Sequence, residues 1–191
     1  MKIGIFGGSF DPPHKGHISI LEHCRNEFSL DRIIVVPTGE PPHKDSCRAS
    51  ALHRFNMCRL AFEGCEVSDY ETKKTGYCYS ADMLEHFKKM YENDELYFII
   101  GGDSLDYIDK WYQPERIFRA ADIIVADRIG SDEDSAKKQV EKFGGKVHIA
   151  HNAIVKISST RIRKCIEEKL PFEQFVGEKV FGYILENNLY G

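Results

Sequence analysis

Two histidines in a glycine-rich turn are the residues of this sequence best suited to chemistry. Residues 7–17 read Gly-Gly-Ser-Phe-Asp-Pro-Pro-His-Lys-Gly-His, so His14 and His17 follow an apolar run and precede a helical pattern that begins near Ile18. Glycines let an anion approach the main chain closely, and a helix N-terminus offers N–H groups and the positive end of a dipole. This stretch, which we call the histidine motif, predicts a nucleotide-phosphate site. Its spacing matches neither GxGxxG nor the P-loop GxxxxGK[ST].

A second candidate phosphate site lies where the sequence becomes wholly helical, at residues 157–164. Ile157 is followed by three hydroxyl residues, which are typical helix N-caps, and then by Arg161, Arg163 and Lys164. Cations in a first helical turn oppose the dipole at about 0.3–1 kcal/mol each, and a bound polyphosphate would reverse that effect. We therefore expect this serine–arginine motif to bind phosphate. Ordinary caps followed by a solvated basic face are the alternative.

Composition limits the classes of partner. The chain has 191 residues, with 26 basic and 30 acidic side chains and a formal charge of −4. It has no overall basic field for a nucleic-acid backbone, so we expect no nucleic-acid partner and only local phosphate binding. Six cysteines without a CxxC pair favour reduced, mostly buried thiols, although their even number leaves disulfides open. Without a signal pattern or a long apolar run, we expect a cytoplasmic protein without membrane contact.

The strands and helices that position these motifs are predicted from alternating apolar patterns. They predict an α/β fold with a doubly wound, mainly parallel sheet, which binds ligands beyond the carboxyl ends of its strands. We expect one domain, residues 1–191, in which residues 158–191 form a small C-terminal helical part. Strands are predicted at residues 2–6, 32–37, 65–68, 96–100, 123–127 and 147–150, and helices at 16–28, 49–62, 80–91, 114–120, 132–143 and from 158 to about 169.

Both motifs resemble signatures of one superfamily. The histidine motif is similar to the G-[ST]-F-D-P-x-H-x-G-H signature of the nucleotidyltransferases, and residues 157–163 resemble their I-S-[ST]-T-x-I-R motif. The resemblance implies a Rossmann-like nucleotidyltransferase fold and the catalytic groups His14, His17, Lys44 and Arg163. It implies an ATP site composed of Gly7, Gly8, Ser9, Phe10, His14, His17, Gly101, Asp103, Ile157, Ser158, Ser159, Thr160 and Arg163.

Three further stretches narrow the resemblance to bacterial nicotinate-nucleotide adenylyltransferases. They are Pro-Pro-His-Lys at residues 41–44, Gly-Gly-Asp-Ser-Leu at residues 101–105 with Trp111 beyond, and residues 76–84. In that family the tryptophan stacks on the pyridine ring, the aspartate contacts ribose, and main-chain N–H groups at a helix start receive the pyridine carboxylate. Ser80 is the expected N-cap there. The implied site for nicotinate mononucleotide is Ser9, Lys44, Tyr79, Ser80, Asp103 and Trp111. A surface turn at residues 41–44 and a core tryptophan are the alternatives.

The implied reaction is adenylyl transfer in NAD biosynthesis. The 5′-phosphate of nicotinate mononucleotide would attack the α-phosphorus of ATP, giving nicotinate adenine dinucleotide and pyrophosphate. Two anions must meet, which accounts for the histidines, Lys44 and Arg163 and for an expected Mg²⁺ cofactor. This ion is expected to be held mainly by the substrate phosphates, with no metal ligands from the protein.

Several alternatives stay open. The acceptor could be nicotinamide mononucleotide, phosphopantetheine or a sugar-alcohol phosphate, or the chain could be a nucleotide sensor without activity. A hydrolase could instead use Asp11, His14 and His17 as metal ligands. Residues 127–130 depart from the family's usual sequence, which leaves the adenine side undetermined. The sequence also leaves open whether the protein forms a homo-oligomer.

Overall fold

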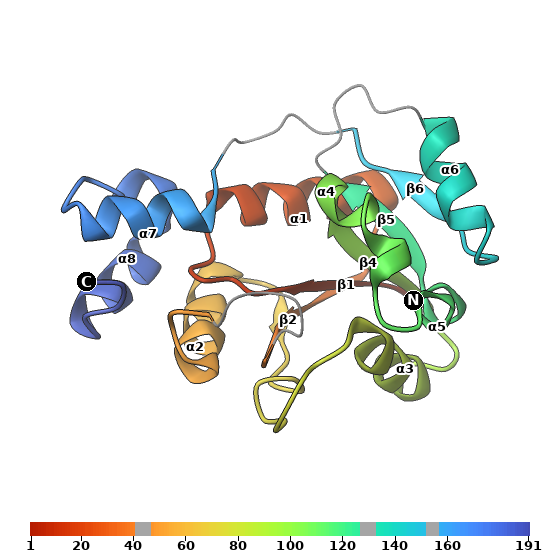
Figure 1. The fold of residues 1–191 in the computed structure, drawn as a ribbon, viewed down its shortest axis with the longest axis horizontal. Coiled ribbons are helices and arrows are strands. Elements are labelled where there is room, and N and C mark those ends of the chain that lie inside the picture. Colours follow the sequence, from red (N-terminus) through yellow and green to blue (C-terminus); the bar gives the residue numbers. More distant parts are fainter. Residues whose placement is uncertain (41–46, 127–132, 152–156) are drawn as a thin grey trace. The chain divides into compact units, whose positions relative to one another are not determined.

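A six-stranded sheet carries the fold. The computed structural model describes residues 1–40, 47–126, 133–151 and 157–191. The strand order is β3-β2-β1-β4-β5-β6, and β1–β4, β4–β5 and β5–β6 pair in parallel (Figure 1). The order reverses between β1 and β4, which is the switch point of a doubly wound sheet, so the predicted fold class is confirmed. The strands are β1 (Lys2–Gly8), β2 (Arg32–Pro37), β3 (Glu66–Val67), β4 (Glu95–Gly101), β5 (Asp122–Ala126) and β6 (Val147–Ile149).

The helices fall close to their predicted positions. Three short helices, α4, η1 and η2, were not predicted from the sequence because segments of three or four residues carry no periodicity. The main helices are α1 (Lys15–Phe28), α2 (Ala51–Ala61), α3 (Ser80–Met90), α5 (Pro114–Ala120), α6 (Glu133–Glu141), α7 (Ser159–Glu167) and α8 (Glu178–Glu186), and the short ones are α4 (Gly102–Leu105), η1 (Ile108–Lys110) and η2 (Glu173–Phe175).

Packing divides the chain into two interleaved units. Unit 1 comprises residues 1–7, 20–34 and 79–154, and unit 2 comprises residues 8–19, 35–78 and 155–191. Each unit draws on three separate stretches of chain, so the units are not domains in succession. The expectation of a single domain over residues 1–191 stays a prediction.

Unit 1 is built on apolar strands. The β4 and β5 side chains are almost all buried, as expected for parallel strands covered on both faces, and Ile99 is paired with Ile124. Strands β1 and β4 are neighbours in parallel register, with Ile5 opposite Phe98. The carboxyl ends of both strands therefore lie at the same edge of the sheet, where the histidine motif and residues 101–105 begin.

Unit 2 has its own apolar core, to which the helices after residue 158 contribute. Helices α7 and α8 lie beside each other in Figure 1, and their buried side chains join those of α2. Ser158 caps α7, because its Oγ accepts a hydrogen bond of 3.2 Å from the Arg161 N–H, as the hydroxyl run predicted. The predicted helical part at residues 158–191 is thus present. Its shared core consists of Ala49, Met57, Ile162, Phe172, Val176, Val180 and Ile184.

The cysteines are free thiols in the structure. Cys24, Cys58 and Cys78 are buried, and the other three are partly buried. Burial raises the pKa of the Cys24 thiol to about 12, so this group stays protonated and unreactive at neutral pH. Among the residues that the structure describes, no helix is both long and apolar enough to cross a bilayer.

Candidate active site

The turn after β1 brings the two histidines of the motif into contact. Their rings stack with centroids 3.6 Å apart, and the His17 ring also meets the edge of Phe10 at 5.1 Å. Phe10 is buried with φ of 48°, a conformation that side-chain-bearing residues adopt at a cost of about 1 kcal/mol or more. Its ring packs on Gly8, where a Cβ would come within 2.9 Å. The glycine and the strained turn together fix the imidazoles at the start of α1.

A main-chain hydrogen bond sets the tautomer of His17. The His14 N–H donates to His17 Nδ1 over 3.2 Å, and the His17 N–H donates to the His14 carbonyl over 2.9 Å. A neutral imidazole carries one N–H, so a ring whose Nδ1 accepts has its proton on Nε2. His17 is thereby prepared to donate from Nε2, which suits a phosphate oxygen as acceptor.

The ionisation state of His14 follows from its burial. Its side chain is 6 % exposed, and burial lowers its pKa to about 4. The ring is therefore neutral at pH 7 in the free protein, so positive charge for a bound anion would have to come from other groups. Within the described part of the chain, its buried Nδ1 has no hydrogen-bond partner. A buried polar atom without a partner is uncommon and is a feature of functional sites.

The serine–arginine motif contacts the histidine motif directly. Ser159 Oγ donates to the Pro12 carbonyl over 2.9 Å, and Arg163 Nη1 donates to the Asp11 carbonyl over 2.7 Å. Arg163 Nη2 also donates to Thr160 Oγ1 over 3.3 Å. Both motifs belong to unit 2. Two segments that lie about 150 positions apart in sequence thus form one polar cluster, which agrees with the prediction that both bind phosphate.

Arg163 is only partly used by these contacts. Its side chain is 21 % exposed, and its nearest carboxylate oxygen, Asp11 Oδ2, lies 3.8 Å away. The Nε atom is buried and, among the described residues, has no hydrogen-bond partner. This guanidinium therefore keeps donor capacity for an anion while Asp11 holds it in place.

Two buried polar residues support this cluster, and the sequence did not predict that role for either of them. Arg54 is 1 % exposed and donates to the carbonyls of Ser9 over 2.8 Å, Gly39 over 2.8 Å and Ala49 over 3.2 Å. It joins the histidine motif to the loop after β2. The signal was a cation in α2 at helical spacing from the buried Met57 and Cys58.

Asp11 is the second missed support. Its carboxylate accepts hydrogen bonds from the N–H groups of Arg48 at 2.9 Å and Ala49 at 3.1 Å, and from the Tyr190 hydroxyl at 2.7 Å. This carboxylate is 5 % exposed and already satisfied, which disfavours its role as a metal ligand of a hydrolase. In the described ranges, no group of three or more His, Cys, Asp or Glu side chains is placed to hold a metal ion.

Several of the predicted residues lie in unit 1. Trp111 ends η1 and meets Phe98 of β4 edge to face, with centroids 6.2 Å apart. The Tyr79 ring packs against the exposed Tyr112 at 4.3 Å. Asp103 lies in the first turn of α4, directly after β4. Asp103 and Trp111 thus follow β4, and Tyr79 directly precedes α3.

The prediction that Ser80 caps α3 is wrong by one residue. The N-cap is Tyr79, in an extended conformation and without a side-chain capping bond, and Ser80 is the first helical residue. The main-chain N–H groups at this helix start therefore have no side-chain cap from Tyr79. This arrangement agrees with their predicted use for an external carboxylate.

The predicted site residues fall into three groups. Lys44 lies outside the described residues, as does the segment 127–130 on the adenine side. The members in unit 1 are Gly7, Tyr79, Ser80, Gly101, Asp103 and Trp111. The members in unit 2 are Gly8, Ser9, Phe10, His14, His17, Ile157, Ser158, Ser159, Thr160 and Arg163. Ile157 packs against the apolar core of unit 2, so its side chain has a structural role.

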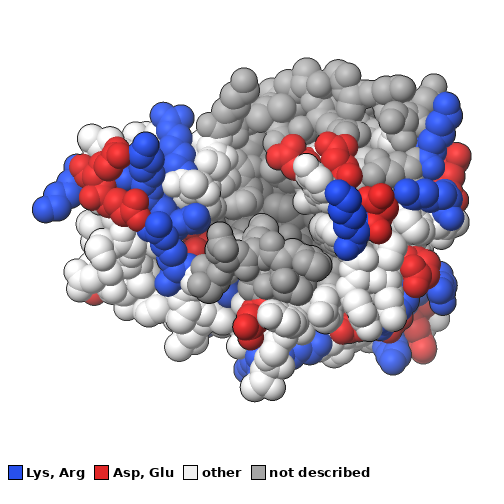
Figure 2. Space-filling model, viewed as in Figure 1, with Lys and Arg blue, Asp and Glu red and all other residues white. Residues whose placement is uncertain are grey.

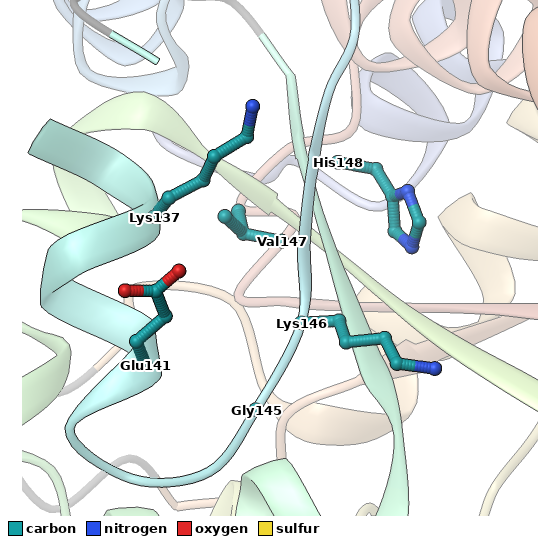
Figure 3. A pocket seen from close by; sticks show the side chains of 6 residues that line it. All are labelled: Lys137, Glu141, Gly145, Lys146, Val147 and His148. Carbon is teal, nitrogen blue, oxygen red and sulfur yellow. The ribbon is translucent and has the colours of Figure 1, made fainter. Parts of the chain in front are cut away.

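The described surface also carries features that lie apart from the predicted site residues. On the face shown in Figure 2, basic and acidic side chains are interspersed over the described surface, in keeping with a net charge of −4. A surface pocket of about 270 Å³ lies between α6 and β6 (Figure 3). None of its lining residues belongs to the predicted set; they are Lys137, Glu141, Gly145, Lys146, Val147 and His148.

Comparison with known proteins agrees with this geometry. The cytidylyltransferase-like family profile matches residues 5–165. A probable nicotinate-nucleotide adenylyltransferase from Clostridium tetani is 39% identical, with 99% of this chain and 98% of that protein covered. Another from Carboxydothermus hydrogenoformans is 37% identical, with 99% of this chain and 98% of that protein covered.

Solved structures support the fold. Plasmodium falciparum nicotinic acid mononucleotide adenylyltransferase complexed with NaAD matches with a TM-score of 0.80 at 23% identity, covering 99% of this chain and 97% of that one. A putative nicotinate-nucleotide adenylyltransferase from Vibrio parahaemolyticus matches with a TM-score of 0.69 at 21% identity, covering 96% and 98%. On the sequence relatives and the family profile, this chain belongs to the nicotinate-nucleotide adenylyltransferase family, within the cytidylyltransferase-like proteins.

Proposed function

We propose that this chain transfers the adenylyl group of ATP to nicotinate mononucleotide, giving nicotinate adenine dinucleotide and pyrophosphate in NAD biosynthesis. The observation that carries the proposal is the polar cluster of unit 2, in which the stacked histidines adjoin the serine–arginine motif. The two imidazoles and the guanidinium in this cluster are groups that could bind a polyphosphate, which supports the proposal. Family membership supports the same reaction.

The proposed chemistry needs no nucleophile from the protein. An oxygen of the mononucleotide phosphate attacks the α-phosphorus of ATP in line, and the bond from that phosphorus to the β-bridging oxygen breaks. A diphosphate linkage forms as pyrophosphate leaves. Catalysis then rests on positioning and on stabilising the charge that moves onto the leaving group.

Each group of the cluster has a role suited to its state. The Nε2–H group of His17 donates a hydrogen bond to an α-phosphate oxygen. The neutral His14 ring donates or accepts a hydrogen bond beside it. Arg163, with Ser159 and Thr160, holds the β- and γ-phosphates, and Lys44 adds charge on the acceptor side. We call these groups, together with Gly8, Ser9 and Phe10, the phosphate side.

Mg²⁺ is proposed as the cofactor that accompanies ATP. It favours phosphate oxygens and water over cages made wholly of protein groups. The Asp11 carboxylate already accepts three hydrogen bonds, so the substrate phosphates are the fitting ligands. When bound, the ion neutralises the polyphosphate charge.

The pyridine side is proposed to consist of Tyr79, Ser80, Asp103 and Trp111. The uncapped N–H groups at the start of α3 would receive the pyridine carboxylate, and Trp111 would stack on the ring. Asp103 would accept from ribose hydroxyls. A carboxylate on N–H donors favours the acid over the amide, whose neutral group gains less there.

Pyrophosphate release from ATP and Mg²⁺ tests the proposal, with nicotinate mononucleotide, nicotinamide mononucleotide and phosphopantetheine assayed side by side. We expect release that strongly favours the nicotinate substrate. Comparable turnover of the two pyridine nucleotides would keep adenylyl transfer but contradict the carboxylate site. Release with phosphopantetheine alone would contradict the pyridine side altogether. ATP binding without release with any acceptor would favour a nucleotide sensor.

A further inference from the structure

We propose that Tyr190 is a positioning residue of the phosphate side, acting through Asp11. Tyr190 follows α8 and lies far along the chain from the histidine motif, yet its hydroxyl donates to Asp11 Oδ1 over 2.7 Å. Both residues belong to unit 2. The inference rests on the proposed function for its kinetic consequence, whereas the hydrogen-bonding role itself can be tested without it.

Asp11 is the point at which several segments meet. Its two carboxylate oxygens accept from the N–H groups of Arg48 and Ala49, and its main-chain carbonyl accepts from Arg163 Nη1. The carboxylate of Asp11 also lies 3.8 Å from Arg163 Nη1. Any shift of Asp11 therefore moves a proposed ATP-binding arginine together with the turn that carries His14.

Among the residues that the structure describes, Tyr190 supplies the one side-chain hydroxyl that bonds to this carboxylate. Oδ1 is shared between the Ala49 N–H at 3.1 Å and the Tyr190 hydroxyl at 2.7 Å, which makes the hydroxyl its closer donor. Hydrogen bonds to a charged acceptor are among the stronger ones in proteins. Burial, with the nearby charge of Asp11, raises the pKa of Tyr190 well above its usual value, so the phenol stays protonated and keeps donating.

The chain offers a matched control on the neighbouring helix. Tyr183 of α8 also uses its hydroxyl between two partners in unit 2, His53 Nδ1 at 3.0 Å and Asn56 Nδ2 at 3.0 Å. Neither partner belongs to the phosphate side. Tyr183→Phe removes a hydroxyl of the same kind from the same helical part, without touching Asp11.

The experiment compares Tyr190→Phe and Tyr183→Phe with the unaltered protein in pyrophosphate release and in amide hydrogen exchange. We expect Tyr190→Phe to lower kcat about tenfold, with a smaller change in KM for nicotinate mononucleotide, because a misplaced Arg163 weakens transition-state contacts. Tyr183→Phe should change kcat less than about twofold. Thermal unfolding of both variants, followed alongside, should show similar small decreases in Tm.

Amide exchange of Arg48 and Ala49, followed by NMR, is the readout that does not need turnover. Both N–H groups bond to Asp11, so their exchange should become about tenfold faster in Tyr190→Phe and change little in Tyr183→Phe. Unchanged exchange in Tyr190→Phe, or equal kcat losses in the two variants, would overturn the inference. An unaltered protein that releases no pyrophosphate would contradict the proposed function, and the exchange result would still decide the role of Tyr190.

Discussion

The phosphate side and the pyridine side are constructed differently. On the phosphate side, buried polar side chains form hydrogen bonds to the main chain. Arg54 donates to three carbonyls, and the Asp11 carboxylate accepts from two main-chain N–H groups and a hydroxyl. On the pyridine side, aromatic rings lie near the surface and the start of α3 has no side-chain cap. Under the proposed roles, hydrogen-bonded buried groups would position the reacting phosphates, while apolar and main-chain contacts would recognise the acceptor.

The strongest way to break this comparison is to remove the support under the phosphate side. Arg54→Met would leave one buried and two partly buried carbonyls without their donor, so the free energy of unfolding should fall by roughly 3–6 kcal/mol. Urea unfolding measures this loss. Arg59→Met, an exposed site on the same helix, is the control and should change stability by less than about 0.5 kcal/mol. A similar small loss at both positions would show that the carbonyls do not depend on Arg54.

Removing the donor at the α-phosphate should leave the fold intact and slow the chemistry. We expect His17→Ala to lower the rate by roughly a hundredfold to a thousandfold with much less effect on stability. Pyrophosphate release and thermal unfolding measure the two effects. His23→Ala, on the same helix and paired with Glu27, should keep nearly full activity. A tenfold or smaller loss for His17→Ala would remove His17 from its proposed role.

The buried state of His14 can be tested by pH. Its folded pKa of about 4 lies below the usual 6.5, so its neutral ring contributes stability that is complete above pH 6.5 and is lost as pH falls toward 4. Between pH 7 and pH 4, the unaltered protein should lose about 3 kcal/mol more unfolding free energy than His14→Asn. Urea unfolding across that range measures the difference. Parallel curves for the two proteins would contradict a depressed His14 pKa.

The smallest expected effect is a change in KM on replacing Trp111, which tests the proposed pyridine side. Trp111→Ala should raise KM for nicotinate mononucleotide about tenfold through lost stacking, while KM for ATP changes little. Steady-state kinetics with each substrate varied in turn measures both constants. Tyr107→Ala removes an exposed ring from the same stretch and should change neither. An equal rise in both KM values for Trp111→Ala would indicate a structural role for the tryptophan.

The sequence predicted the fold well, for identifiable reasons. Strand β2 and helix α5 were placed at their observed bounds, because a buried apolar run and a proline at the first helical position are strong local signals. The expectation that residues 7–17 and residues 157–164 belong to one ATP site came only from the resemblance to a known superfamily. Local pattern does not give such a long-range pairing.

Local sequence pattern does not predict the hydrogen bonds that support the site. Arg54 and Asp11 bond to main-chain groups that only the tertiary fold brings together. The helical spacing of Arg54 from Met57 indicated a buried side chain, but it did not identify the carbonyls that this side chain binds. Tyr190 was missed for the same reason. The cap of α3 was misplaced by one residue because the sequence offered a serine where the fold uses an extended tyrosine. His14 was expected among the charge-balancing groups, yet burial makes it neutral, and burial is a tertiary property.

A crystal structure with bound nicotinate adenine dinucleotide would test the central claim most directly. We predict the diphosphate of this product beside His17 Nε2 and the N–H groups of the histidine motif, and its pyridine carboxylate on the main-chain N–H groups at the start of α3 with Trp111 against the ring. A diphosphate bound away from His17 and Arg163, or a pyridine ring remote from Trp111, would contradict the division into a phosphate side and a pyridine side.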